Sequence, residues 1–162
     1  MAKIVALAKE GKKQGFKIGD ELVSFDGYPF CDILDCLFYD SKEKFSVVVK
    51  RNGKEKTIKV KKKADVPLGI EIDKELSPVR CKNKCKFCFV DQLPKGMRDA
   101  LYVKDDDYRF SFISGSYVTM TNVTEKDIER ILRLKLSPLY ISVHAMNDEI
   151  RKDLVRNPNT LK

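Results

Sequence analysis

Residues 81–88 of this 162-residue chain read CKNKCKFC, so three of its five cysteines fall within one short segment. Cys81, Cys85 and Cys88 are spaced by four and three residues, which lets a single loop turn all three thiols toward one metal centre. Lysines alternate with the cysteines, which argues against a packed core and favours the thiolate form that binds metals. The segment therefore predicts a three-thiolate metal site.

Two kinds of metal centre are compatible with this spacing. A structural zinc site needs four protein ligands, but the chain has a single histidine, His144, and its other two cysteines lie in a more N-terminal segment. A 4Fe-4S cluster held by three cysteines leaves one iron open to an external ligand, so it can support chemistry as well as structure. We favour the cluster and keep zinc as the alternative.

The sequence around the cysteines resembles a known family. The run CKNKCKFCFVDQLPKGMRDALYVKDDDYRFSFISGSYVTMTNV, with LSPLYISVHA after it, resembles the radical S-adenosylmethionine (radical SAM) superfamily. It is most similar to the PDZ-linked radical-SAM-like proteins of the domain-of-unknown-function 512 family, and GFKIGDELVSFDGYPFCDILD resembles the PDZ-like domain that begins them. The resemblance covers almost the whole chain. It implies a 4Fe-4S cluster and S-adenosylmethionine as cofactors and leaves the substrate unknown.

The resemblance also implies cofactor-binding roles for residues other than the cysteines. Phe87 would lie beside the adenine of S-adenosylmethionine, with a packing role as an equal alternative. Gly115 and Ser116 stand where the superfamily carries a glycine-rich segment for the methionine amino group, but FISGSYVT lacks its doubled glycine and carboxylate, which favours a simple turn. By a separate argument, His144 ends a predicted parallel strand, where such sheets bind ligands, although a lone histidine is more often structural. The acidic run at 105–107 is typical of a solvated loop.

The second part of the chain, residues 65–162, predicts an α/β fold. Strand patterns occur in LGIEI, RFSFISGSYVTMT and LYISVHA, the last apolar enough to be buried on both faces. Helices are predicted after Thr124, which forms a capping-box pattern with Asp127, and over DEIRKDLVRN. Strands and helices that alternate through short connections form parallel sheets. This pattern is compatible with an open sheet or a barrel, and the resemblance implies a partial (βα) radical-SAM-like barrel.

The first part, residues 1–64, predicts a small, strand-rich α+β domain, and the resemblance implies that it is PDZ-like. ELVSF forms a strand, a helix with one apolar face begins after Asp32, and KFSVVVKR and KEKTIKVK form a hairpin around Asn52 and Gly53. Cys31 and Cys36 lie beside the apolar face of that helix and are interpreted as buried small hydrophobes. The pattern breaks after residue 61 and a proline follows, which places the domain boundary near residue 64.

Composition limits the partners and the location of the protein. The hydrophobic fraction is 43%, no apolar run is long enough to cross a bilayer, and the N-terminal residues do not form a secretory signal. We therefore expect a cytoplasmic protein without a membrane partner. The net charge of +8 permits nucleic-acid binding, but much of the excess lies in lysines without interleaved aromatic residues, so this partner is not favoured.

These observations predict iron-sulfur cluster binding in a radical-SAM-like protein. Its complete form would reduce S-adenosylmethionine to methionine and a 5'-deoxyadenosyl radical. Because the sequence after Cys88 suffices for about two further strands, we expect an N-terminal fragment of a longer enzyme, not fully active by itself. The PDZ-like domain would dock within the full-length protein or bind a peptide. The alternative is a non-enzymatic PDZ-like adaptor with a structural zinc or redox metal site.

Overall fold

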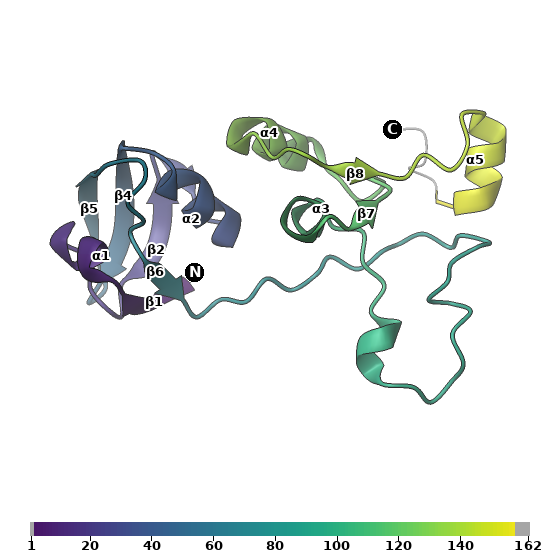
Figure 1. Cartoon of the computed structure of the whole chain (residues 1–162), viewed down its shortest axis with the longest axis horizontal. Coiled ribbons are helices and arrows are strands. Elements are labelled where there is room, and N and C mark those ends of the chain that lie inside the picture. The colour runs from purple at the N-terminus through teal and green to yellow at the C-terminus, as the bar shows by residue number, and fades with distance from the viewer. Residues whose placement is uncertain (1, 158–162) are drawn as a thin grey trace. The chain divides into compact units, whose positions relative to one another are not determined.

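A computed structural model describes residues 2–157 of the chain and divides it into two compact units, Met1–Leu76 and Ser77–Lys162. Figure 1 shows a strand-rich first unit and a second unit in which helices and short strands alternate. No helix within the described residues is long and apolar enough to cross a membrane. Each unit is considered by itself below.

The first unit is built on an antiparallel sheet with the strand order β5-β4-β2-β1-β6, and a short β3 pairs with β2. Its strands are β1 (Ala2–Leu7), β2 (Glu21–Phe25), β3 (Tyr28–Pro29), β4 (Lys44–Arg51), β5 (Lys54–Lys61) and β6 (Ile70–Ile72). The helices are α1 (Lys9–Lys13) and α2 (Ile33–Asp40).

Local sequence signals explain the elements that were predicted here. Asn52 and Gly53 take positive φ angles of 52° and 78° and join β4 to β5 in a tight hairpin, as expected for this dipeptide. Asp32 caps α2 by accepting a hydrogen bond from the backbone N–H of Leu34, and Asp35 completes a capping box. The hairpin and the helix are confirmed.

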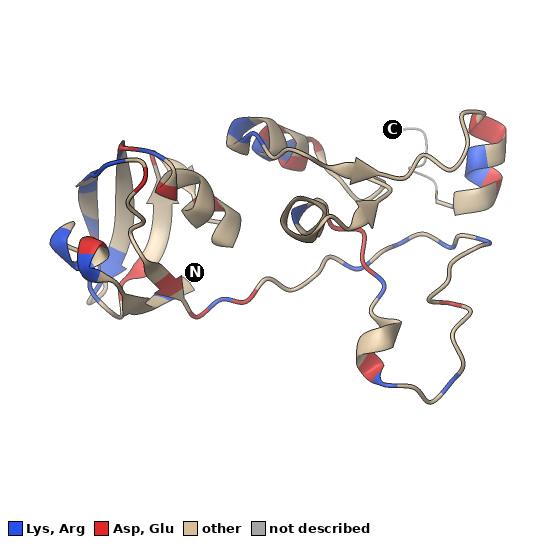
Figure 2. Ribbon diagram, viewed as in Figure 1, with Lys and Arg blue, Asp and Glu red and all other residues tan. Residues whose placement is uncertain are grey.

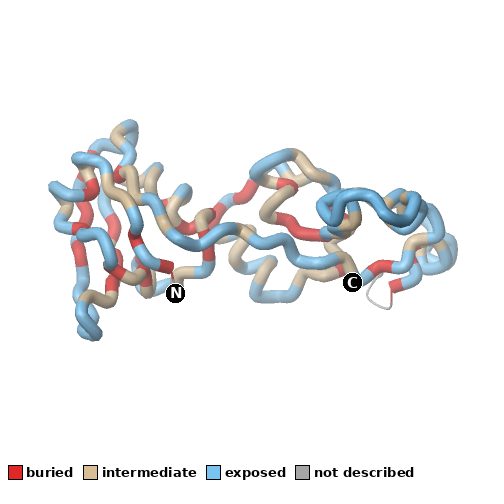
Figure 3. The backbone as a smooth tube through the Cα atoms, turned by 90° about the horizontal axis from the view of Figure 1, so that it is seen from below, coloured by how far each residue is buried: buried red, intermediate tan, exposed pale blue. Residues whose placement is uncertain are grey.

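The core of the first unit lies between the sheet and α2, and Figure 3 shows buried residues along the strands. Leu22 and Phe25 both face the core because β2 carries a bulge against β4, where the register shifts between Leu22 and Ser24. The core is completed by Ile4, Phe16, Leu34, Tyr39, Phe45, Val47, Val49, Ile58, Val60 and Leu68.

The two cysteines of the first unit differ in environment. Cys36 packs against the core, and its burial, helped by neighbouring carboxylates, raises the pKa of its thiol to about 12. It therefore behaves as a small hydrophobe, as expected. Cys31 is exposed, so the prediction that it is buried is wrong. It precedes the N-cap of α2, where the chain enters the helix from the surface.

The first unit extends beyond the boundary expected near residue 64. LGIEI forms a strand as predicted, but this strand, β6, pairs antiparallel with β1 and not with the later strands. Leu68 is buried in the core, and its backbone N–H donates to Asp40 at the end of α2. The division therefore falls after Leu76.

Lysines account for much of the surface of the first unit. Figure 2 shows Lys and Arg on β4, β5 and α1. On β5 the lysines are exposed and alternate with the buried Ile58 and Val60 toward its end. The basic excess thus lies on solvated strand faces.

In the second unit, helices and strands alternate along the chain (Figure 1). The elements are the 3-10 helix η1 (Asp99–Tyr102), α3 (Tyr108–Ser114), β7 (Tyr117–Val118), α4 (Glu125–Leu134), β8 (Tyr140–Ile141) and α5 (Asp148–Val155). β7 and β8 are parallel, with Tyr117 opposite Tyr140. The capping box of Thr124 and Asp127 at the start of α4 is confirmed.

The segment RFSFISGSYVTMT differs from the predicted strand. Residues 108–114 form α3, because the side chain of Asp107 caps its first turn and Gly115 ends it with a left-handed φ of 74°. Aromatic and β-branched composition favoured a strand, but the signals at the two ends of the segment are those of a helix. Only Tyr117 and Val118 remain extended.

The strand predicted over LYISVHA is also shorter than expected. β8 contains only Tyr140 and Ile141, and both are exposed, because within the described residues its sheet has one other strand. A strand is buried on both faces only when helices cover both sides of its sheet. The described residues therefore form a mixed α/β unit with one parallel strand pair, and they do not form a barrel.

Candidate cofactor site

The cysteine segment begins next to an isolated β-bridge between two parts of the chain. Arg80 and Asp105 form an isolated antiparallel bridge, and the backbone N–H of Cys81 donates to the carbonyl of Lys104 at 2.8 Å. Just before it, the backbone N–H of Val79 donates to the buried carboxylate of Asp107 at 2.9 Å. These bonds fix the position at which Cys81 enters the site.

The second half of the segment attaches to the end of α5. The backbone N–H groups of Lys84 and Lys86 donate to the carbonyls of Val155 and Leu154 at 3.2 and 2.9 Å. The Lys86 ammonium also lies 2.5 Å from the carboxylate of Asp153. Cys88 closes a turn by donating from its N–H to the carbonyl of Cys85. Both ends of the cysteine segment are therefore held by backbone hydrogen bonds.

A buried polar network lies inside the loop. Asn83, between the first two cysteines, is only 3% exposed; it donates to Thr119 Oγ1 at 2.9 Å and accepts from Thr121 Oγ1 at 2.8 Å. Asp106, also 3% exposed, accepts from the N–H and the hydroxyl of Thr119 and shares the hydroxyl proton of Thr121 with Asn83. Asn157 donates to the same amide oxygen of Asn83. The network joins the cysteine loop to the residues after β7.

A cavity of about 500 Å³ brings most of the predicted site together. Its walls include the three cysteines, Phe87, Ser116 and His144. The rings of Phe87 and His144 are in contact, with centroids 5.0 Å apart. Pockets that hold cofactors commonly have volumes of about 300–1,000 Å³. Six of the seven residues singled out from the sequence thus share one cavity of suitable size.

Gly115 is the predicted site residue that does not line this cavity. It ends α3 in the left-handed conformation, and a Cβ placed there would meet only the ring of Tyr140 at 3.7 Å. This geometry agrees with the turn interpretation of FISGSYVT. Ser116, which lines the cavity, has its hydroxyl 3.2 Å from that of Ser114.

Electrostatics around the thiols differ from the expectation based on the alternating lysines. Burial raises the pKa of Cys81 and of Cys85, and the nearby Lys104 ammonium only partly offsets this effect. Burial would lower the pKa of Lys104 itself, but hydrogen bonds to Asp91 and Cys88 outweigh it and raise the pKa. The cation that favours thiolate here is Lys104, contributed by a segment distant in sequence.

The donor chemistry of the cavity fits an iron-sulfur cluster. Three cysteine thiols line one space, and thiolates are the usual protein ligands of such clusters. Within residues 2–157, however, no three Cys, His, Asp or Glu side chains already converge on a metal-sized point. The cysteine segment is formed of turns and irregular structure, so its side chains can close around a centre without breaking a helix or strand.

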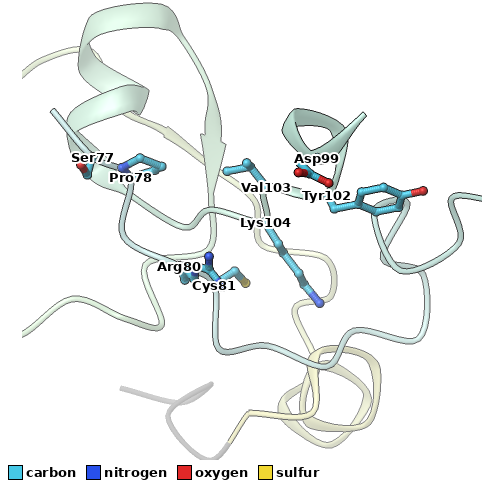
Figure 4. Close-up of a pocket in the computed structure, with 8 residues that line it drawn as sticks. All are labelled: Ser77, Pro78, Arg80, Cys81, Asp99, Tyr102, Val103 and Lys104. Atoms are coloured by element: carbon cyan, nitrogen blue, oxygen red, sulfur yellow. The ribbon is translucent and has the colours of Figure 1, made fainter. Parts of the chain in front are cut away.

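Figure 4 shows the lining of a second cavity, which has a volume of about 580 Å³. It shares Cys81, Val103 and Lys104 with the first cavity and is otherwise lined by Ser77, Pro78, Arg80, Asp99 and Tyr102. Cys81 is the only predicted site residue among them, so the larger cavity is not the one that unites the thiols.

Sequence reasoning missed the buried network. The acidic run at 105–107 was interpreted as a solvated loop, yet Asp106 and Asp107 are buried, so that interpretation is wrong for both. Asp107 caps α3, and Arg109 donates to both of its carboxylate oxygens. Burial alone would raise the pKa of Asp107, but the hydrogen bonds from Arg109 outweigh it and lower the pKa. The carboxylates directly before the helix are a local signal from which the cap at Asp107 could have been predicted. The contact between Asn83 and Thr119 has no such local signal in the sequence.

Comparison with known protein families gives one match. A family described as "Radical SAM-like domain" matches residues 62–162, more than half of the chain. A search of curated proteins gives no match. The matched region contains all the residues of the cavity.

Proposed function

Because the chain belongs to the radical SAM-like domain family, we propose that Cys81, Cys85 and Cys88 hold a 4Fe-4S cluster and that S-adenosylmethionine binds in the same cavity. The observation that carries this proposal is the cavity itself, where the three thiols meet Phe87, Ser116 and His144. A cytoplasmic location, in which thiols stay reduced, is part of the proposal.

Each side chain has a distinct task in this proposal. The three thiolates would hold the cluster and leave one of its irons able to take S-adenosylmethionine. When bound, the cluster would supply the electron for reductive cleavage of S-adenosylmethionine into methionine and a 5'-deoxyadenosyl radical. Phe87 and His144, whose rings touch, form an aromatic wall that can pack against a purine and keep water out. Ser116 offers a hydroxyl to the polar end of the ligand.

Anaerobic reconstitution followed by iron and sulfide counting tests the proposal. We expect about four irons per chain. Cys85→Ala should abolish the cluster, whereas Cys31→Ala, at an exposed cysteine in the first unit, should load as much iron as the wild type. Equal loading of the Cys85→Ala variant would place the ligands elsewhere.

A structural zinc site is the second candidate, and one observation favours it. His144 lines the same cavity as the three cysteines and would complete a Cys₃His set. Zinc at one ion per chain, with its affinity lost in His144→Ala, would support this alternative. In the cluster proposal, His144→Ala leaves the iron count unchanged, because histidine is not a ligand there.

We also propose that the first unit is a PDZ-like docking module. β6 pairs only with β1 among the described strands, so its other edge is open to an added strand. Beside it, a groove of about 100 Å³ is lined by Phe25, Ile33, Cys36, Leu37, Asp40, Leu68, Gly69 and Ile70. We favour intramolecular docking of an extended segment of the same protein. Addition of free peptides with apolar C-termini, followed by backbone NMR shifts, tests the peptide-binding alternative.

A further inference from the structure

The charges that line the cysteine cavity are predominantly negative. Asp105 and Asp106 contribute carboxylates, and Lys104 is the only Lys or Arg among the described lining residues. The Lys104 ammonium is already engaged by Asp91 at 2.6 Å. Burial and the nearby charge of Arg151 lower the pKa of His144, which disfavours a positive charge on its ring. Thiolates at the three cysteines would make the cavity more negative still.

Asp106 is the buried member of this set. Its carboxylate accepts hydrogen bonds at 2.5 Å from the N–H of Thr119 and at 2.7 Å from the Thr119 hydroxyl, and the Thr121 hydroxyl, 3.1 Å away, shares its proton between this carboxylate and Asn83. All three donors are neutral, and no cationic side chain within the described residues forms an ion pair with it. A buried charge is costly unless an opposite charge or several hydrogen bonds compensate it. The network thus fixes the carboxylate in place through neutral donors and provides no cationic partner among the described residues.

We propose that Asp106 supplies the fixed negative charge that receives the positively charged sulfonium of S-adenosylmethionine in this cavity. The inference rests on the proposed function, in which the amino and carboxylate groups of the ligand go to the open iron and leave the sulfonium as its uncompensated charge. Asp106 is suited to this role because it lines the cavity while hydrogen bonds from Thr119 and Thr121 fix its carboxylate. Burial keeps water from screening the attraction.

Equilibrium binding to reconstituted protein with an oxidised cluster tests the inference without turnover. S-Adenosylmethionine and S-adenosylhomocysteine differ by one methyl group and the sulfonium charge, so their affinity ratio reports recognition of that charge. We expect the wild type to prefer S-adenosylmethionine about tenfold or more, as for a charged partner in a buried site. Asp106→Asn, which keeps the shape and removes the charge, should bring the ratio close to one.

The matched control is Asp105→Asn. It removes a carboxylate from the same cavity, but Asp105 is exposed, so water screens its charge and the ratio should change less than about twofold. Asp106→Glu, which retains the charge, should keep the preference for the sulfonium. Iron is counted in every variant, so that a change in the ratio is separated from loss of the cluster.

Three results would overturn the inference. Equal wild-type affinities for the two ligands would do so without any variant. An unchanged ratio in Asp106→Asn at full iron content would reject the role of Asp106 while leaving the cluster proposal intact. Absence of iron from the reconstituted wild type would instead reject the proposed function, and the inference with it.

Discussion

At the residue scale, one ion pair connects the turn before β2 to the end of β4. The guanidinium of Arg51 donates to both carboxylate oxygens of Asp20, at 2.6 and 2.7 Å, and also to the carbonyl of Gly15 at 2.9 Å. The N–H of Lys17 donates to the same carboxylate. The side chain of Asp20 is 1% exposed. Such a bidentate, desolvated pair is costly to break on one side only.

Asp20→Asn should lower the free energy of unfolding of the first unit by about 3 kcal/mol, because it leaves the Arg51 charge without its partner. Burial alone would raise the pKa of Asp20, but Arg51 and the Lys17 N–H outweigh it and lower the pKa from 3.8. A lowered carboxyl pKa contributes stability that is complete above the unfolded pKa and is lost as the pH falls through the folded value. Chemical denaturation between pH 7 and pH 2 measures both effects.

Glu21→Gln is the control for this prediction. Glu21 pairs with Lys3 at 3.6 Å, and the lysine side chain is 59% exposed. Exposed pairs contribute about 0–1 kcal/mol, so this variant should unfold nearly as the wild type does. If Asp20→Asn lost as little stability and kept the same acid sensitivity, the buried pair would not be a stabilising contact.

Only some residues of the cysteine site could be predicted from the sequence. The spacing of Cys81, Cys85 and Cys88 is local, so one sequence suffices to group them. Asn83 and Asp106 could not be grouped, because their shared partner, Thr119, lies 36 residues beyond Asn83 and 13 beyond Asp106. Contacts of that range depend on the fold and leave no periodic signal in the sequence.

At the element scale, the close approach of β6 to the end of β1 requires glycine at position 69. Gly69 has a φ of 61°, and the N–H of Ala8 donates to its carbonyl at 2.8 Å. A Cβ placed at Gly69 would lie 2.3 Å from the Cβ of Ala8, well inside van der Waals contact. The backbone must therefore move if any side chain is introduced.

Gly69→Ala should destabilise the first unit by about 3 kcal/mol or more, since it combines a left-handed backbone strain with a clash against β1. Gly53→Ala is the matched control, because Gly53 has a φ of 78° and no atom within 4 Å of its added Cβ. It should cost only about 1 kcal/mol, the backbone strain alone. Thermal unfolding of the two variants compares them. Equal losses would show that β6 does not approach β1 this closely.

Elements bounded by strong local signals were the predictable ones. α2 and α4 have capping boxes, and the hairpin has Asn52 and Gly53, so their positions are encoded within a few residues. α3 was missed because its apolar composition suggested a strand and outweighed the cap at Asp107 and the glycine at 115. β6 was recognised as a strand, but pairing between strands distant in sequence is not visible in either strand alone.

At the scale of the whole molecule, the two units differ in how much apolar surface they bury. The first unit encloses a continuous core, whereas the second exposes large hydrophobic side chains on β7, β8 and α4, including Tyr117 at 72% and Leu132 at 71%. Exposed apolar surface of this kind marks sites of association. The first unit is therefore the part that we expect to fold by itself.

The residues that pack in its core determine how long the first unit must be to fold by itself. A chain ending at residue 64 lacks Leu68, Ile70 and Ile72, all packed on the core, and also loses the pairing of β6 with β1. Burial of three such side chains contributes roughly 5 kcal/mol, which is comparable to the whole stability of a small domain. Residues 1–76 should give a cooperative unfolding transition and protected amides on β2 and β4, whereas residues 1–64 should be largely unfolded under the same conditions. Circular dichroism and amide exchange on both fragments measure this difference. A stable, cooperative fragment 1–64 would show that β6 is an accessory strand and would return the domain boundary to the position that the sequence pattern predicts.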